Sequence, residues 1–332
     1  MKKLFPFICM FCMSMIVFAQ NTLVATLTHG NEISMFYGTY ALQQANRAAQ
    51  SGDVINLSGG SFQATNITKG ISLRGTGIDD VNPTYIINDF EINIPSSDTC
   101  RLSMEGIRCT GNINMGGTFN RPYFVKSKFH HVYFNDNSSI KNALFANCKI
   151  TDSTLYGSST VQFINSYVSG FYSSSATASS FVNCVISSYN MHLEHVEVSQ
   201  LYNCIIVSGK STRDFDYSLP STTTATNCVS IGYKSPFSQN PANTKNKAIG
   251  YTEYNKVFKD FTGSYSDIQT FELTDEAKTE YLGNDGTEVG MHGGIMPYSS
   301  TPSYPQITKM NVANKTTADG KLSVEIEVSA VE

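Results

Sequence analysis

Short apolar runs recur through the middle of the chain at a spacing of about twenty residues, and most of them end on an Asn followed by a small residue. The segments with this pattern are YFVKSKF, LFANCKI, QFINSYV, SFVNCVI, QLYNCII and TATNCVS. They combine β-branched and aromatic residues with Ser and Thr over short alternations, which favours strands over amphipathic helices. A period near twenty that slips by a few residues predicts a β-solenoid whose turns carry loops of unequal length.

We interpret the recurring Asn as a corner residue. A straight strand would place the Phe two positions before the Asn and the small residue after it on opposite faces of the sheet. A bend at the Asn changes this parity, so that both columns face inward. Asn tolerates the left-handed backbone of such a bend better than other non-Gly residues, and its amide can bond to the Asn one turn away. The predicted ladder consists of Asn147, Asn165, Asn183, Asn203 and Asn227.

Small residues follow these corners and are expected to stack inside the coil. They include Cys148, Ser166, Cys184 and Cys204. A buried free Cys behaves as a small hydrophobe, so we interpret these thiols as packing residues, with a Cys184–Cys204 bridge as the less favoured alternative. Cys100 and Cys109 are the better candidates for a disulfide, because the chain is expected to be exported.

The N-terminal part predicts a cap followed by the first turns of the coil. Apolar residues at helical spacing within 35–49 predict a short amphipathic helix, and VINL, a Gly-Gly turn and ISLRGTG follow it. This order and the Asn corners resemble right-handed parallel β-helix proteins of the pectin-lyase-like superfamily over roughly residues 24–296. The resemblance implies the fold but no particular activity, because this scaffold carries lyases, hydrolases, esterases, tailspikes and adhesins.

The two ends of the chain differ from its middle. Residues 1–19 have the positive start, short apolar run and small final residues of a signal peptide, and the run is too short for a membrane-spanning helix. The mature chain is therefore expected to be secreted, periplasmic or at the cell surface, with no membrane span. Residues 20–296 form the predicted solenoid with its cap, 297–306 a Pro-rich linker, and 307–332 two strands.

The sequence thus predicts an all-β fold. It is a right-handed parallel β-helix, or β-solenoid, with an N-terminal capping helix and a short C-terminal β-hairpin. Only 15% of the residues are charged and the formal net charge is −4, which argues against nucleic acid as a partner.

One candidate catalytic cluster follows from the alignment of the turns. Aligning them on the small residue stacks Lys128 on Lys149 and His131 on Asp152, with His130 beside them. An amine base beside a second positive group suits β-elimination from a uronic acid, in which one group takes the C5 proton and the other stabilises the carboxylate. The alternative is that these are ordinary solvated side chains on an exposed sheet.

Two further polar segments carry weaker signals. Strand alternation in 191–198, MHLEHVEV, splits its His and Glu residues between two faces, and neither face completes a three-ligand metal site. The longest inter-turn insertion contains Arg213, Asp214 and Asp216, which we interpret as a candidate ligand-binding rim. Two carboxylates without a fixed frame are weak evidence for Ca²⁺, so we predict no cofactor.

Two functions remain open at this point. Pectate-lyase-like proteins carry R-x-P-x-x-R, but Arg121-Pro122 lacks the second Arg, and His292-Gly293-Gly294 is not the G-H-G of polygalacturonase-like proteins. The missing motifs and the many Tyr, Ser and Asn favour a non-catalytic, adhesin-like protein that binds a polysaccharide or a cell-surface glycan. The alternative is a polysaccharide lyase or glycosidase acting on an acidic polysaccharide.

Overall fold

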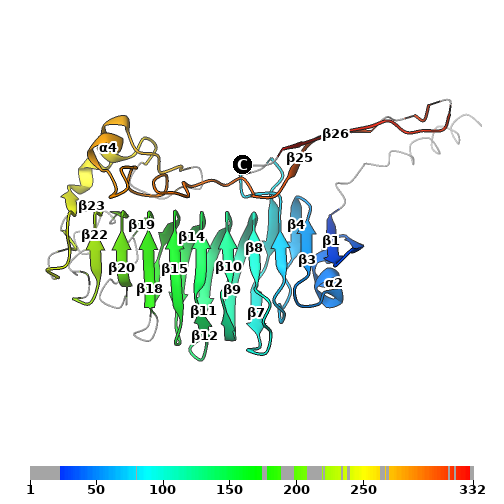
Figure 1. Cartoon of the computed structure of the whole chain (residues 1–332), viewed down its shortest axis with the longest axis horizontal. Coiled ribbons are helices and arrows are strands. Elements are labelled where there is room, and N and C mark those ends of the chain that lie inside the picture. Colours follow the sequence, from blue (N-terminus) through cyan, green and yellow to red (C-terminus); the bar gives the residue numbers. More distant parts are fainter. Residues whose placement is uncertain are drawn as a thin grey trace, which may run out of the picture.

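The chain forms a parallel β-solenoid of about eight turns, which confirms the predicted all-β fold (Figure 1). The computed structural model describes residues 23–79, 81–173, 178–187, 198–207, 219, 221–232, 235–237, 240–261, 266, 269–312, 315–317 and 319–329. No helix in these residues is both long and apolar enough to cross a membrane.

Two long sheets run along the axis of the solenoid. In the first, the edge pair β2 and β1 is antiparallel and the strands after β3 are parallel. The first sheet, sheet A, contains, in spatial order, β2 (Glu32–Tyr37), β1 (Val24–His29), β3 (Val54–Leu57), β5 (Ser72–Arg74), β8 (Ser103–Glu105), β10 (Tyr123–Val125), β13 (Ala143–Ala146), β15 (Thr160–Ile164), β18 (Ala178–Val182), β20 (Val198–Tyr202) and β22 (Thr224–Thr226).

The second sheet, sheet B, follows sheet A across a sharp corner in nearly every turn. Its main path consists of β4 (Gly60–Gln63), β6 (Thr84–Ile87), β9 (Ile107–Asn120), β11 (Lys128–Phe134), β14 (Lys149–Leu155), β16 (Tyr167–Ser169), β19 (Val185–Ser187), β21 (Ile205–Val207), β23 (Val229–Ile231) and β24 (Lys247–Ile249). Strands β7 (Phe90–Ile94) and β12 (Ser139–Lys141) pair with β9, and β17 (Phe171–Ser173) pairs with β14.

The corner between the sheets has a left-handed backbone in successive turns. The φ angles of the five Asn lie between 46° and 58°, and Lys126 takes the same conformation one turn earlier with φ 48°. The bend brings the Phe column into the core, where Phe145 and Phe163 stack at 5.2 Å and Phe163 and Phe181 at 4.7 Å. All three rings are fully buried. The Phe column therefore faces the core, as the sequence predicts for a chain that bends at the Asn.

The amides of the corner Asn residues mostly bond to a different part of the chain from the one the sequence suggested. Asn227 Nδ2 does donate to Asn203 Oδ1 at 3.0 Å. Asn165 Nδ2 instead donates to the carbonyls of Met291 and Gly293, at 2.8 and 2.6 Å. The reason is that residues 281–305, which we name the C-terminal strap, run back along the corners and offer backbone groups to them (Figure 1).

The C-terminal strap contacts turn after turn of the solenoid. Ser299 N donates to Asn147 Oδ1 at 2.5 Å, and Ser303 N donates to Glu105 Oε1 at 2.6 Å. Further along, the Tyr304 hydroxyl donates to the carbonyl of Gly75. The segment 297–305 thus lies against the solenoid, and it leads to a hairpin of β25 (Gln306–Val312) and β26 (Val324–Ser329).

A second apolar core lies outside the coil, between sheet B and the C-terminal region. Outward residues of sheet B, among them Tyr167, Val185 and Ile205, are fully buried there. They pack under residues from α3 (Tyr254–Val257), α4 (Asp275–Glu280), the segments between these helices and the C-terminal strap. The outer face of sheet B is therefore covered over much of its length, which the sequence analysis did not anticipate.

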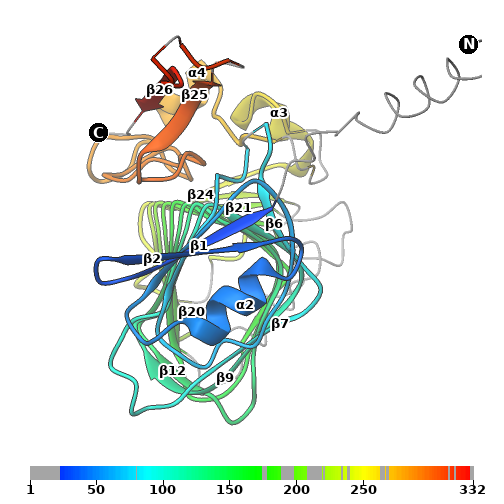
Figure 2. The same cartoon turned by 90° about the vertical axis from the view of Figure 1, so that its right-hand side faces the viewer.

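The predicted capping helix is shorter than the apolar pattern suggested. Residues 35–37 belong to β2, and α2 (Ala41–Ala48) begins only after Gly38. Ala41, Leu42 and Ala45 are buried, and α2 lies across the end of the solenoid (Figure 2). The helix therefore closes the apolar core at the N-terminal end.

The six cysteines described by the structure are all free thiols. Cys100 and Cys109 are not bridged, and Cys109 is fully enclosed in the core, where loss of hydration raises the pKa of its thiol far above the usual range. Burial also raises the pKa of the Cys148 thiol to about 12. These cysteines act as small apolar residues of the core.

The corner geometry predicts different costs for two substitutions at one Asn. Asn165→Ala and Asn165→Gly both remove the amide bonds to Met291 and Gly293, but only Ala must hold a left-handed backbone, at ~1–2 kcal/mol. We expect Asn165→Ala to lower the free energy of unfolding by roughly 1 kcal/mol more than Asn165→Gly, measured by denaturant titration. Equal destabilisation by the two substitutions would show that the left-handed backbone at position 165 costs Ala no more free energy than it costs Gly.

Thiol reactivity should follow burial, because the thiolate is the reactive form. In a protein beginning at Gln20, we expect a thiol reagent at about pH 8 to label only the half-buried Cys100 in the native state and all six cysteines after denaturation. Cys100→Ser should abolish the native reaction. Fewer than six reactive thiols in denatured, unreduced protein would reveal a disulfide.

Candidate functional site

The structure brings the two predicted lysines together and adds an arginine to them. Lys128 pairs in register with Lys149 on one side and with Arg108 on the other, so three cations lie at the starts of three neighbouring parallel strands, within the first two residues of each. Their side chains lie on the outer face of sheet B, because the residues that follow them, such as Phe129 and Ile150, are fully buried. We name these three residues the cation row.

The cation row borders a cleft between sheet B and the C-terminal strap, which we name the strap cleft. Its volume is about 650 Å³. It is lined by Asp79, Arg108, Lys149, Thr270, Glu272, His292, Tyr298, Ser299, Ser300 and Thr301. These residues span more than 200 positions of the sequence, from Asp79 to Thr301, and the return of the strap along the corners brings them together.

Lys149 does not stand on an open platform, as the sequence analysis assumed. It is 5% exposed, and its Nζ donates to the Gln269 carbonyl at 3.1 Å and lies 5.6 Å from the centre of the Tyr298 ring. Arg108 Nε donates to the Ile78 carbonyl, and its Nη2 lies 3.4 Å from Asp79 Oδ1. Gln269 and the strap residue Tyr298 thus cover Lys149, at one end of the cation row.

His130, His131 and Asp152 lie further along the same strands, away from the residues that line the strap cleft. His131 pairs in register with Asp152, but its Nε2 lies 3.2 Å from Thr154 Oγ1. His130 is exposed, and its carbonyl accepts a hydrogen bond from Thr151 Oγ1 at 2.7 Å. The five candidate residues therefore do not form one site: Lys149 lines the strap cleft, Lys128 pairs with it in register outside the lining, and the other three lie on an open surface.

Three tyrosines stand one per turn on this open surface, and we name them the tyrosine stripe. The ring centres of Tyr133 and Tyr156 are 5.7 Å apart, and those of Tyr156 and Tyr172 are 5.5 Å apart, in edge-to-face contact. The His131 ring extends the stripe, 6.1 Å from Tyr133. Loss of hydration and the neighbouring phenols raise the pKa of Tyr156, and a neutral phenol both donates and accepts hydrogen bonds.

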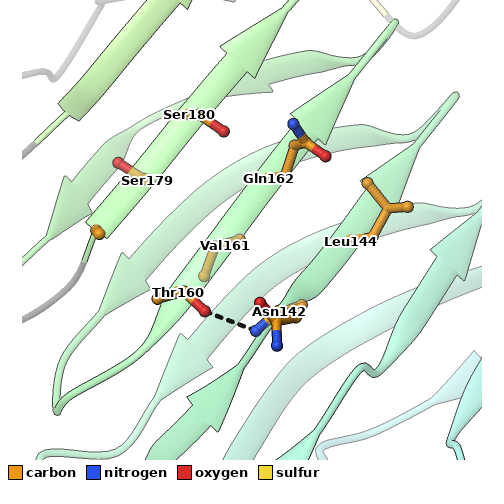
Figure 3. A pocket seen from close by; sticks show the side chains of 9 residues that line it. Asn142, Leu144, Thr160, Val161, Gln162, Ser179 and Ser180 are labelled. Atoms are coloured by element: carbon orange, nitrogen blue, oxygen red, sulfur yellow. Dashed lines mark hydrogen bonds between the residues drawn. The ribbon is translucent and has the colours of Figure 1, made fainter.

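A shallow groove lies on the outer face of sheet A (Figure 3). Its volume is about 420 Å³, and side chains such as Asn142, Thr160, Gln162 and Ser180 line it across β13, β15 and β18. Asn142 N donates to Thr160 Oγ1 at 2.6 Å. The lining has neither charged nor aromatic side chains, so this groove offers hydrogen bonds but no stacking surface.

Some of the sequence-based candidates cannot be placed. Arg213, Asp214 and Asp216, and the His and Glu residues of 192–197, lie outside the described residues. Among the residues that are described, no group of three or more His, Cys, Asp and Glu is arranged to hold a metal ion.

Sequence reasoning missed Arg108, His292, Tyr298 and the tyrosine stripe. Arg108 follows a corner formed by Gly106, with φ 69°, so a search for Asn at the corner passed over this turn. His292 Nε2 donates to the Thr270 carbonyl at 2.7 Å, a contact between two parts of the C-terminal region that carry no repeat. His292 and Tyr298 come close to sheet B because of the path of the strap, which the sequence does not show.

Comparison with known proteins gives no match for this chain among family models, curated proteins or solved structures. The resemblance to the pectin-lyase-like superfamily therefore has no support beyond the shared type of architecture. A parallel β-solenoid carries many unrelated activities, so the function must be argued from the surfaces of this molecule.

Proposed function

We propose that this chain is an exported β-helix protein of the pectin-lyase-like type that binds a glycan on its surface without catalysing a reaction. The observation that carries the proposal is the tyrosine stripe. Half-buried rings on successive turns give an apolar surface whose axis follows the solenoid, so an extended chain of sugars can lie along it. Aromatic side chains with polar tips favour ligands that are apolar on one side and hydroxylated on the other.

Polar side chains lie beside the tyrosine stripe on β9 and β14. Asn114 pairs in register with Tyr133, and its Nδ2 donates to Glu91 Oε1 at 2.7 Å. Asp152 lies beside His131 on the next strand. Carboxylates and amides held in this way can accept and donate hydrogen bonds to sugar hydroxyls, while the rings contact the C–H faces.

The alternative function is a lyase or glycosidase acting on an acidic polysaccharide, and the cation row favours it. Both amines of the predicted pair need access to the sugar, one to take the proton and the other to stabilise the carboxylate, whereas Lys149 is nearly enclosed and already contacts Gln269 and Tyr298. The imidazole of His131 lies against Thr154 rather than a carboxylate. Glycan binding at the tyrosine stripe does not require these contacts to change, so we place glycan binding first.

The proposal predicts that removing one ring of the stripe weakens binding to a glycan found on a glycan array. An aromatic contact contributes about 0.5–1.5 kcal/mol, so Tyr156→Ala should weaken the affinity roughly two- to tenfold in a calorimetric titration. Gln162→Ala, in the groove on sheet A, is the matched control and should bind as the wild type does.

Three results would contradict this function. The first is an array on which the protein binds no glycan, and the second is loss of binding in Gln162→Ala with full binding in Tyr156→Ala. The third is release of unsaturated uronides from acidic polysaccharides, followed by ultraviolet absorbance and abolished by Lys128→Ala, which would establish the lyase instead.

A further inference from the structure

The edge of sheet A at the N-terminal end of the solenoid is open. β2 is the first strand in the order of this sheet, and among the described residues it pairs with β1 alone (Figure 2). Proteins usually protect such an edge with Lys, Pro or a very short strand, because its free backbone groups can pair with another strand. β2 has six residues, EISMFY, with neither Lys nor Pro. The edge therefore lacks the usual protection.

Every second residue of β2 directs its backbone groups to the open side. Hydrogen-bonded and non-hydrogen-bonded positions alternate along an antiparallel pair. Gly38 N donates to the Leu23 carbonyl at 2.9 Å, so the positions of β2 that bond to β1 have even numbers. The N–H and C=O groups of Ile33, Met35 and Tyr37 therefore point away from β1.

The side chains of the same three residues form an exposed apolar face. Ile33, Met35 and Tyr37 are 65%, 58% and 57% exposed. They lie on the outer face of sheet A, because they alternate with Phe36, which packs against the core. The open edge thus presents hydrogen-bonding groups and apolar side chains at the same positions.

A second copy of this chain fits the edge in one register. A two-fold axis perpendicular to the sheet makes two β2 strands antiparallel and keeps their outer faces on the same side. With Met35 opposite Met35, Ile33 lies opposite Tyr37 of the second copy. All the outward backbone groups of both strands then meet in hydrogen-bonded pairs, and the apolar side chains of the two copies join on one face.

The charge and the size of β2 also suit this pairing. Its one charged residue, Glu32, meets Gly38 of the second copy in this register, so like charges do not face each other. A strand of six residues is ~20 Å long, which places the contact among the smaller protein interfaces, below about 1,200 Å². An area of this size supports a weak, reversible dimer.

We propose that β2 is a dimerisation edge, at which a second copy of this chain pairs antiparallel around Met35. The A sheets of the two copies continue into each other at their N-terminal ends. The pairing is the same for both copies and uses both of these edges, so assembly at β2 stops at the dimer. It does not depend on glycan binding at the tyrosine stripe.

The test is sedimentation velocity of the mature chain, beginning at Gln20, over a range of micromolar concentrations. We expect a reversible equilibrium between monomer and dimer. Met35→Lys places like charges opposite each other on the two-fold axis and should raise the dissociation constant about tenfold or more. Ile295→Lys is the matched control, because Ile295 lies on the strap and is 96% exposed, and it should dimerise as the wild type does.

Disulfide trapping checks the register, in a Cys100→Ser background that removes the half-buried thiol. With oxidised glutathione as the oxidant, Met35→Cys should form a covalent dimer, because the two copies of this position face each other. Ile33→Cys alone should not, whereas an equal mixture of Ile33→Cys and Tyr37→Cys should. If Met35→Lys does not fold, this experiment decides alone.

The proposal is overturned if the wild type remains a monomer at the highest concentration, or if a folded Met35→Lys dimerises as tightly as the wild type. It is also overturned if Ile295→Lys loses as much affinity as Met35→Lys. Covalent dimers of Ile33→Cys that form as readily as those of Met35→Cys would contradict it too, because the strands would then pair in another register.

Discussion

The left-handed corner between the two sheets is the constraint on which the rest of the structure depends. Without it, the apolar column of sheet A and the small residues after the corner would face opposite sides, and the core could not close. The bend costs little at Asn and leaves its amide pointing out of the coil. The same residue thus sets the inward packing of the Phe column and supplies the outward groups to which the strap bonds.

The strap converts a repetitive coil into a molecule with distinct faces. Its backbone accepts from Asn165 and Asn227 and donates to Asn147, so it is fixed to the turns that the corners define. Where it and the preceding helices lie over sheet B, outward positions become a second core. Beyond that cover, outward residues of sheet B face solvent and include the tyrosine stripe.

The sequence predicts the coil well because the coil repeats. The Asn at 147, 165 and 183, with a Phe two positions before each, gave the period, the corner and the inward columns. It also placed Lys128 beside Lys149 in the observed register. Each of these inferences uses only contacts between equivalent positions of neighbouring turns, which a repeat makes visible.

The strap was not predictable in this way, because its contacts join positions 55 to 229 residues apart that share no repeat. One signal was present: the outward column that begins with Lys128 and Lys149 continues with Tyr167, Val185 and Ile205. A run of apolar residues on an outward face implies a cover. Such a pattern shows that something lies above the strands, but it does not say which segment does so.

The position of the C-terminal region over sheet B decides which outward side chains are enclosed and which face solvent. Lys149, the first residue of β14, lines the strap cleft, and outward residues three to five positions later on β11 and β14 lie on the open surface. A strand rises about 3.3 Å per residue, so the two surfaces are separated by only ~10–15 Å. One pair of strands therefore presents a charged, partly enclosed face and an aromatic, solvated face. Both surfaces follow from one register, which is set at the corner.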